Sequence, residues 1–147
     1  MEIPPKGAIE IETVLPASVE KVWQAWTAPD IILQWFGSDP NGKGIAAVLN
    51  VQPGGAFQIT FADANGTVHT CSGTYTIVEE FSKLNFTWEW KSEPGVVSFV
   101  TIILTPEGDN TQMNFTHADL GNESKHDYLN GWNATFLKLK TVLDKSR

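Results

Sequence analysis

The stretch HDYLNGWNATFLKLKTVLDK, residues 126–145, carries a clear helical pattern near the end of the chain. Gly131 interrupts it beside Trp132, although a glycine inside a helix costs about 0.5–1 kcal/mol relative to alanine. We expect this helix to pack against another layer, with Gly131 allowing a neighbouring element to approach closely. Asn122 and Ser124 are candidate caps for a helix that starts between residues 122 and 127. The large apolar residues recur at the helical period and form one stripe: Tyr128, Trp132, Phe136, Leu139, and Val142 or Leu143.

The partner layer is predicted upstream, where apolar and polar residues alternate with a period of two. Turn signals such as ANGT and PEGDN connect the alternating segments, and connections this short favour antiparallel pairing. With AIEIETVL (8–15) and the segment before QPGG (52–55), we expect about seven strands in one curved antiparallel sheet. The alternating segments are AFQITFAD (56–63), HTCSGTYTI (69–77), KLNFTWEW (83–90), VVSFVTIIL (96–104) and TQMNFTH (111–117).

Two short helices are predicted after the first strand. Ser18 is a candidate N-cap for the first, whose apolar residues share one face. Pro29 suits the first position of the second helix, and Gly37 ends it. The order of one strand, two short helices, six strands and a long helix predicts an α+β architecture with the helices on one side of the sheet. We expect one domain over residues 8–146, with residues 1–7 as a short lead-in.

The composition argues against several classes of partner. The 147-residue chain has a net charge of −7, whereas nucleic acids and anionic membranes are bound mainly through Lys and Arg. Cys71 is the single cysteine, so a disulfide within the chain is excluded. The sequence shows neither a signal peptide nor an apolar segment of membrane-spanning length. We therefore expect a cytoplasmic protein without membrane insertion, either a monomer or a homodimer.

The aromatic content of 11%, with six tryptophans, is high for a globular protein. The predicted inner face of the sheet and the facing helices bring many of these rings together. Core packing is one explanation, because any sheet covered by helices needs large apolar residues inside. The polar tips of Trp, Tyr and His among the rings are typical of a ligand pocket, which is the second explanation. The candidate ligand-binding residues are Trp35, Phe57, Phe61, His69, Tyr75, Phe86, Trp88, Trp90, Phe115, His117, Tyr128, Trp132 and Phe136.

Catalytic and metal sites have little support in the sequence. The spacing of His69, Cys71 and His117 matches no specific ligand pattern, so we expect neither a metal nor another cofactor. A histidine inside a pocket could act as a general acid or base, here His69 or His117 with Tyr75 or Asp119 assisting. The sequence contains no nucleophile motif and no phosphate-binding glycine loop, so we assign no catalytic residues.

Five segments along the chain together resemble the START-like superfamily in their order and spacing. Within it, they are similar to the family named for the C-terminal domain of the activator of the heat-shock (Hsp) ATPase. The resemblance covers nearly the whole chain. The segments are LPASVEKVWQAWTAPDIILQWF, PGGAF, ADANGTVHTCSGTYTIVEEFSKLNFTW, VTIILTPEGDNTQMNFTH and GWNATFLKLKTVL.

The resemblance implies a helix-grip fold, in which a long C-terminal helix crosses a curved sheet and a cavity opens between them. In this superfamily the cavity commonly takes hydrophobic ligands such as lipids, and some members are polyketide cyclases or dehydratases. The eukaryotic activator engages its chaperone through an additional N-terminal domain, whereas seven residues precede the first predicted strand here. We therefore rank three functions: binding of a small hydrophobic or aromatic ligand, then polyketide cyclase or dehydratase activity, then a chaperone-associated stress-response module.

Overall fold

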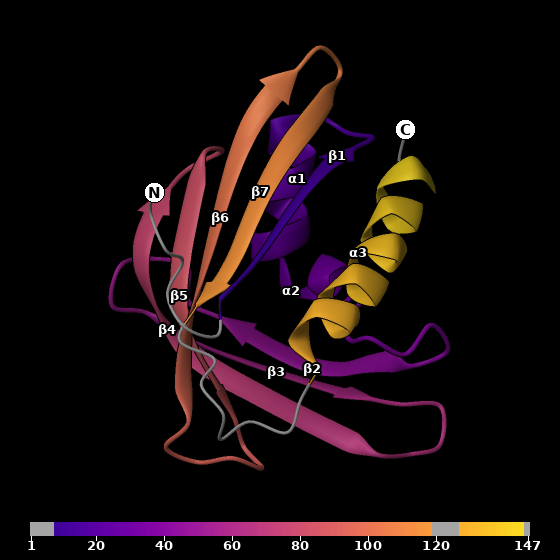
Figure 1. Cartoon of the computed structure of the whole chain (residues 1–147), viewed down its shortest axis with the longest axis vertical. Helices are drawn as coiled ribbons and strands as arrows, with labels where there is room; N and C mark the ends of the chain where they lie inside the picture. Colours follow the sequence, from indigo (N-terminus) through magenta and orange to yellow (C-terminus); the bar gives the residue numbers. More distant parts are fainter. Residues whose placement is uncertain (1–7, 119–126, 146–147) are drawn as a thin grey trace.

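The computed structural model describes residues 8–118 and 127–145, which form a curved sheet with helices on its inner side (Figure 1). Strand β1 (Ile9–Leu15) is followed by helices α1 (Val19–Thr27) and α2 (Pro29–Ile32), and helix α3 (Tyr128–Lys145) comes last. This order confirms the predicted α+β helix-grip fold. The six strands between α2 and α3 are β2 (Lys43–Leu49), β3 (Ala56–Ala62), β4 (Val68–Glu79), β5 (Lys83–Trp90), β6 (Val97–Glu107) and β7 (Asn110–Ala118).

The seven strands form one antiparallel sheet in the order β1-β7-β6-β5-β4-β3-β2. Strands β2 to β7 follow one another as a meander, because each connection is a short turn. Strand β1 instead pairs with the last strand, so that Ile9 lies opposite His117 and Leu15 opposite Thr111. The Thr111 hydroxyl donates to the Ala17 carbonyl oxygen at 2.8 Å, which fastens the end of β1 to β7.

The short helices α1 and α2 begin where the sequence predicts. The backbone N–H of Lys21 donates to the Ser18 hydroxyl at 3.4 Å, so Ser18 is the N-cap of α1. Pro29 occupies the start of α2, where its missing N–H costs nothing. Gly37, soon after α2, has a φ of 108°, and an added side chain there would collide with the Phe61 ring. Both the backbone conformation and the close ring therefore require glycine at this turn.

Helix α3 is capped by Asp127 at its N-terminus. The Asp127 carbonyl oxygen accepts from the Gly131 N–H at 2.9 Å, and its carboxylate accepts from the Asn130 N–H at 3.3 Å. The predicted caps Asn122 and Ser124 lie outside the described residues. Helix α3 is the longest helix in residues 8–118 and 127–145. No helix in these residues is both long enough and apolar enough to cross a membrane.

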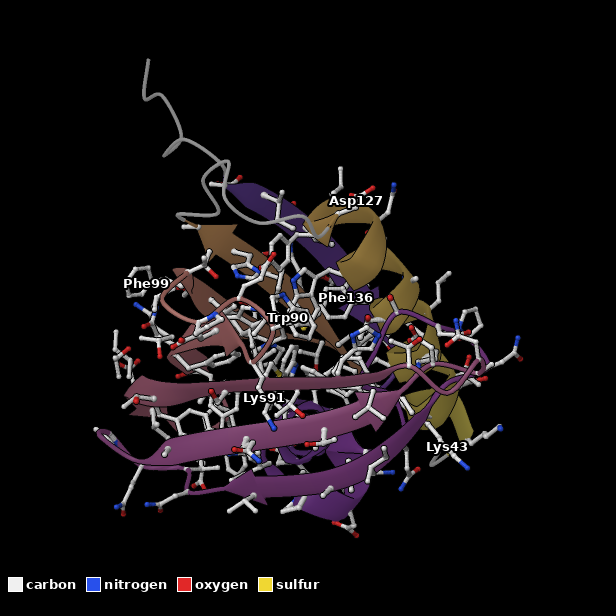
Figure 2. All side chains as sticks on the ribbon, turned by 90° about the horizontal axis from the view of Figure 1, so that it is seen from below. Lys43, Trp90, Lys91, Phe99, Asp127 and Phe136 are labelled. Atoms are coloured by element: carbon white, nitrogen blue, oxygen red, sulfur yellow. The ribbon has the colours of Figure 1, made fainter. Side chains whose placement is uncertain are left out.

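One aromatic core joins the sheet to all three helices. The Trp26 ring of α1 lies 4.8 Å from that of Trp35 after α2, 6.4 Å from Phe115 in β7 and 6.3 Å from Trp132 in α3, measured between ring centroids. In Figure 2, Phe136 also lies between the sheet and α3. The apolar stripe of α3 therefore buries itself against the inner face of the sheet, as its periodicity predicts.

The predicted alternation fails at one place in β4. Tyr75 pairs with Phe86, but the next pair joins Ile77 to Asn85, because a β-bulge shifts the register between them. Val78 then pairs with Leu84 and packs on the core in place of Ile77. The alternation in HTCSGTYTI (69–77) predicts that Ile77 shares the inward face with Tyr75, and this prediction is wrong, since one extra residue in a strand moves every later side chain to the opposite face.

Candidate functional site

An open pocket of about 390 Å³ lies between the sheet and the first half of α3. Its size is within the range of about 300–1,000 Å³ that is usual for small-molecule sites. The sheet contributes Phe61 from β3, His69 from β4, and Trp88 and Trp90 from β5. The loop after α2 contributes Phe36, Gly37 and Ser38. The helix side consists of Asp127, Tyr128, Asn130, Gly131, Trp132, Ala134 and Thr135.

Gly131 leaves part of this space open. A Cβ atom added at Gly131 would meet only the Ser38 Cβ within 4 Å, at an ordinary contact distance of 3.9 Å. The expectation that Gly131 lets a neighbouring element approach α3 closely is therefore wrong. The missing side chain enlarges the pocket instead, because Gly131 and Ser38 both belong to its wall.

A hydrogen bond between Trp90 and Tyr128 connects the sheet to the first residue of α3. The Trp90 indole N–H donates to the Tyr128 hydroxyl at 2.9 Å. The Tyr128 ring also lies 4.6 Å from the His117 ring, between centroids, so it is held against the end of β7. The Trp90 N–H and the Tyr128 hydroxyl therefore place a pair of polar groups among the aromatic rings of the pocket wall.

His69 is a polar group on the pocket wall with a fixed orientation. Its Nε2 lies 2.8 Å from the Asp63 carboxylate, and both side chains are about one-quarter exposed, at 26% and 28%. Phe61 lies opposite His69 in the β3–β4 register, with 5.3 Å between ring centroids, and Trp90 lies 6.0 Å away on the other strand. Two rings and one carboxylate therefore hold the imidazole in place.

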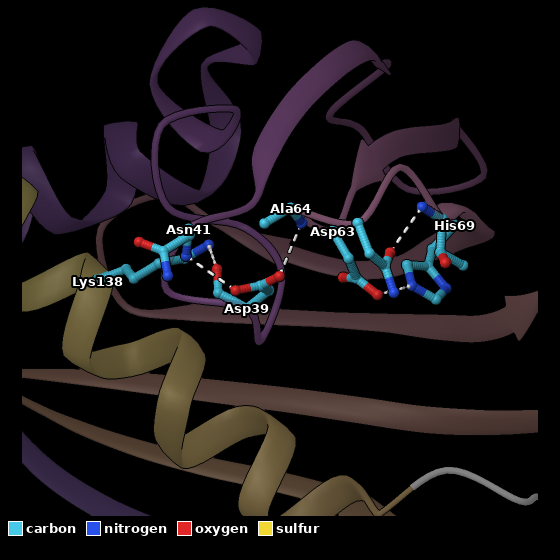
Figure 3. Close-up of polar contacts among 8 residues, drawn as sticks. Asp39, Asn41, Asp63, Ala64, His69 and Lys138 are labelled. Atoms are coloured by element: carbon cyan, nitrogen blue, oxygen red, sulfur yellow. Dashed lines mark hydrogen bonds and ion pairs between the residues drawn. The ribbon is translucent and has the colours of Figure 1, made fainter.

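The turn that carries Asp63 is fastened to α3 through Asp39 (Figure 3). The Asp39 carboxylate accepts from the backbone N–H groups of Ala64 at 2.8 Å and Asn41 at 2.9 Å, and these bonds lower the pKa of Asp39. The Lys138 ammonium of α3 donates to the Asp39 carbonyl oxygen at 3.0 Å. Partial burial lowers the pKa of Lys138, and the negative charges of Asp39 and Asp63 oppose that shift. The contacts link the helix, the loop after α2 and the β3–β4 turn.

His117 is buried beneath the pocket wall and is fully hydrogen-bonded. The Trp132 indole N–H donates to Nδ1 of His117 at 3.0 Å, and Ser98 Oγ lies 2.7 Å from Nε2. Because indole nitrogen only donates, Nδ1 must be the acceptor, so the uncharged ring carries its proton on Nε2 and donates it to Ser98. Burial lowers the pKa of His117 to about 3. The geometry therefore does not support the acid–base role considered for His117.

The structure divides the thirteen candidate residues into two groups. Six of them line the pocket: Phe61, His69, Trp88, Trp90, Tyr128 and Trp132. The other seven belong to the buried interior and not to the pocket wall: Trp35, Phe57, Tyr75, Phe86, Phe115, His117 and Phe136. A ligand-binding role for the thirteen stays a prediction, but only the first group has a surface that a ligand in this pocket could touch.

Two of the seven illustrate why they lie apart from the pocket. Trp35 is fully buried and its indole N–H donates to the Ala25 carbonyl oxygen at 3.0 Å, so its polar tip is satisfied within the helical layer. Tyr75 lines a void of only about 10 Å³ below the pocket, and burial raises the pKa of its hydroxyl. Asp119, the other group considered as an assistant in catalysis, lies outside the described residues.

The wall residues that the candidate set omits are mostly small or polar: Phe36, Gly37, Ser38, Asp127, Asn130, Gly131, Ala134 and Thr135. The small helical residues Gly131 and Ala134 gave one usable signal, because they lie one helical turn apart beside Trp132 and form a row of small side chains next to the apolar stripe. Phe36, Gly37 and Ser38 in the loop gave no signal in the sequence, since their position depends on how the chain folds back after α2.

Comparison with known proteins agrees with this architecture. The family model described as "Activator of Hsp90 ATPase homolog 1-like protein" (AHSA1) matches residues 16–144. No match was found among curated proteins. A crystal structure of a Nitrosomonas europaea protein has a TM-score of 0.80 at 22% identity, with 95% of each chain covered. The solution structure of the AHSA1-like protein from Aeromonas hydrophila has a TM-score of 0.77 at 22% identity, covering 95% of this chain and 93% of that one.

A third similar structure, from Mesorhizobium loti, is 25% identical with a TM-score of 0.74 and covers 95% of this chain and 98% of that one. These structural likenesses establish the shared fold. The family model spans nearly all of the described residues, from the end of β1 through α3. It therefore confirms the resemblance drawn from the sequence motifs, and the chain belongs to the family of Activator of Hsp90 ATPase homolog 1-like proteins, within the START-like superfamily.

Proposed function

We propose that this protein binds a small hydrophobic or aromatic molecule in the pocket between the sheet and α3. The observation that carries the proposal is the pocket itself, about 390 Å³ in volume with six aromatic residues in its wall. Four of those rings are buried and packed against one another, whereas the other two, Trp90 and Tyr128, are only partly buried. In a close-packed interior the remaining space would be filled by side chains. The rings are Phe36, Phe61, Trp88, Trp90, Tyr128 and Trp132.

The charge of the pocket supports an uncharged or weakly polar ligand. The wall residues, all within the described part of the chain, include Asp127 and the titratable His69 but no Lys or Arg. The Asp127 carboxylate is already used in the cap of α3. A fatty-acid carboxylate would therefore enter without a basic partner, and an unpaired charge is costly to remove from water.

The six tryptophans provide a direct test. Trp88, Trp90 and Trp132 line the pocket, whereas Trp23, Trp26 and Trp35 do not. In ¹H–¹⁵N spectra, a ligand in the pocket should shift the indole signals of the first three more than those of the second three. A panel of flavonoids, sterols, polyketides and fatty acids would serve as probes. Equal shifts in all six, or no shift with any probe, would contradict the proposal.

A matched pair of variants tests whether the ligand occupies this pocket. Gly131→Leu places a side chain in the pocket wall, while Asn133→Leu places the same side chain on the exposed face of α3. We expect Gly131→Leu to abolish the indole shifts and Asn133→Leu to retain them. If both variants bind as the unaltered protein does, the ligand lies elsewhere.

A further inference from the structure

We propose that the ligand of this pocket carries a hydroxyl or N–H donor on an aromatic ring, and that the His69–Asp63 pair recognises it. This inference rests on the proposed ligand-binding function and specifies the chemistry of the ligand. It depends on the geometry of His69, on the aromatic rings around it and on the absence of Lys and Arg among the described wall residues.

The hydrogen bond to Asp63 determines what His69 can offer a ligand. A carboxylate only accepts, so Nε2 of His69 carries a proton and donates it to Asp63 at 2.8 Å. In the uncharged imidazole, Nδ1 then holds a lone pair and is an acceptor. Within residues 8–118 and 127–145, Nδ1 forms no hydrogen bond, and the side chain is 26% exposed on the pocket wall. A hydrogen-bond donor on the ligand would give Nδ1 of His69 a partner.

The surroundings of His69 favour an aromatic body for that ligand. The Phe61 and Trp90 rings flank the imidazole at 5.3 and 6.0 Å between centroids, and both belong to the pocket wall. A ligand that reaches His69 therefore contacts two aromatic side chains. An aromatic ring on the ligand would pack favourably against them, either stacked or edge to face.

The position of His69 is fixed from both sides of the pocket. Asp63 is adjacent to Ala64, whose N–H is held by Asp39, and Asp39 in turn accepts from Lys138 of α3 (Figure 3). Such support lowers the cost of ordering the imidazole when a ligand binds. Asp63 is accordingly a positioning residue in this proposal, and His69 is the residue that contacts the ligand.

Three probes of one size separate this inference from the proposed function: 2-naphthol, 2-methylnaphthalene and 2-naphthoate. Dissociation constants would be measured by calorimetry at one fixed pH for all three probes. We expect 2-naphthol to bind about two- to tenfold more tightly than 2-methylnaphthalene, which corresponds to the usual contribution of one net hydrogen bond. We expect 2-naphthoate to bind most weakly, because the described wall residues include no Lys or Arg to pair with its carboxylate.

Two variants test whether His69 and Asp63 cause the preference for 2-naphthol over 2-methylnaphthalene. His69→Phe keeps a ring of similar size but removes the acceptor, so it should bind 2-methylnaphthalene at least as well and lose the preference for 2-naphthol. Asp63→Ala leaves His69 present but unfixed, so the preference should fall while binding of 2-methylnaphthalene persists. The ligand comparison on the unaltered protein remains decisive even if a variant does not fold.

The possible failures can be told apart. If 2-methylnaphthalene or 2-naphthoate binds as tightly as 2-naphthol, the inference about the donor is overturned while the binding function stands. If the preference survives His69→Phe, another wall residue reads the hydroxyl and the assignment to His69 is wrong. If none of the three probes binds, and the wider panel also gives no indole shift, the proposed function itself fails.

Discussion

Replacing Gly131 by alanine should stabilise the protein, although glycine substitutions inside packed folds usually destabilise them. A Cβ atom at Gly131 would meet only the Ser38 Cβ, at 3.9 Å, so the added methyl group causes no collision. The gain is the difference in helix propensity, about 0.5–1 kcal/mol. At about 2–4 °C per kcal/mol for a chain of this size, the melting temperature should rise by roughly 1–4 °C.

The same substitution at Gly73 is the matched contrast. A Cβ atom there would lie 1.9 Å from the Thr87 backbone oxygen of the neighbouring strand, which cannot move without disturbing the sheet. We expect Gly73→Ala to destabilise the fold by at least about 1–3 kcal/mol, the usual cost of overpacking. One added methyl group should therefore have opposite effects at the two glycines.

Urea denaturation of both variants, followed by tryptophan fluorescence, measures the two changes in the free energy of unfolding. Gly131→Ala should also bind a pocket ligand more weakly than the unaltered protein, since the methyl group occupies pocket space. A loss of stability in Gly131→Ala would refute the argument, because it would mean that an element packs closely against the helix at this residue.

Three further predictions concern the polar groups around the site. His117 has a folded pKa of about 3 against an ordinary 6.5, so its contribution to stability should be complete above pH 6.5 and decline as the pH falls towards 3. The slope should be at most about 1.4 kcal/mol per pH unit, measured as the difference between the unaltered protein and His117→Phe in denaturation at several pH values. Ser98→Ala leaves the Nε2–H of buried His117 without its partner and should cost about 1–3 kcal/mol in urea denaturation, whereas an unchanged midpoint would indicate a replacement partner. Tyr128→Phe removes the hydroxyl that accepts from the Trp90 N–H, and this hydrogen bond is only partly buried. We expect the free energy of unfolding to fall by less than about 1 kcal/mol and the Trp90 indole signal to shift. A larger loss of stability would show that the bond also holds α3 in place.

The sequence predicted the fold well because two periodicities dominate it. The alternation in β3, β5 and β7 and the 3.6-residue stripe of α3 place inside most of the side chains that the structure buries. Trp90 and Tyr128 are only partly buried, and Thr135 is buried outside the predicted stripe. The bulge in β4 could not be foreseen, because alternation continues through Tyr75 and Ile77 in the sequence while the pairing with β5 shifts. Periodicity describes one strand at a time, and a bulge is a property of a pair of strands.

The pocket was harder to predict than the fold, since inward-facing residues can line a cavity or fill a core. His69 and His117 both lie on the inner face, yet one is 26% exposed in the pocket wall and the other is fully buried. The difference depends on the separation between α3 and each strand: His117 in β7 contacts Tyr128 and Trp132 of the helix, whereas the ring neighbours of His69 in β4 are Phe61 and Trp90 of the sheet. Leu139, farther along α3, is fully buried, whereas Gly131 leaves a gap. A one-dimensional pattern contains no measure of that separation.

The pairing of β1 with β7 affects the order in which the molecule can assemble during synthesis. Strands β2 to β7 can form hairpins as soon as they leave the ribosome, but β1 must wait for the last strand of the sheet. Helices α1 and α2 can cover part of the inner aromatic face early, but the part that α3 covers remains open to water until that last helix has been made. We therefore expect nascent chains that end before residue 127 to aggregate, because they expose apolar surface that only the last helix covers.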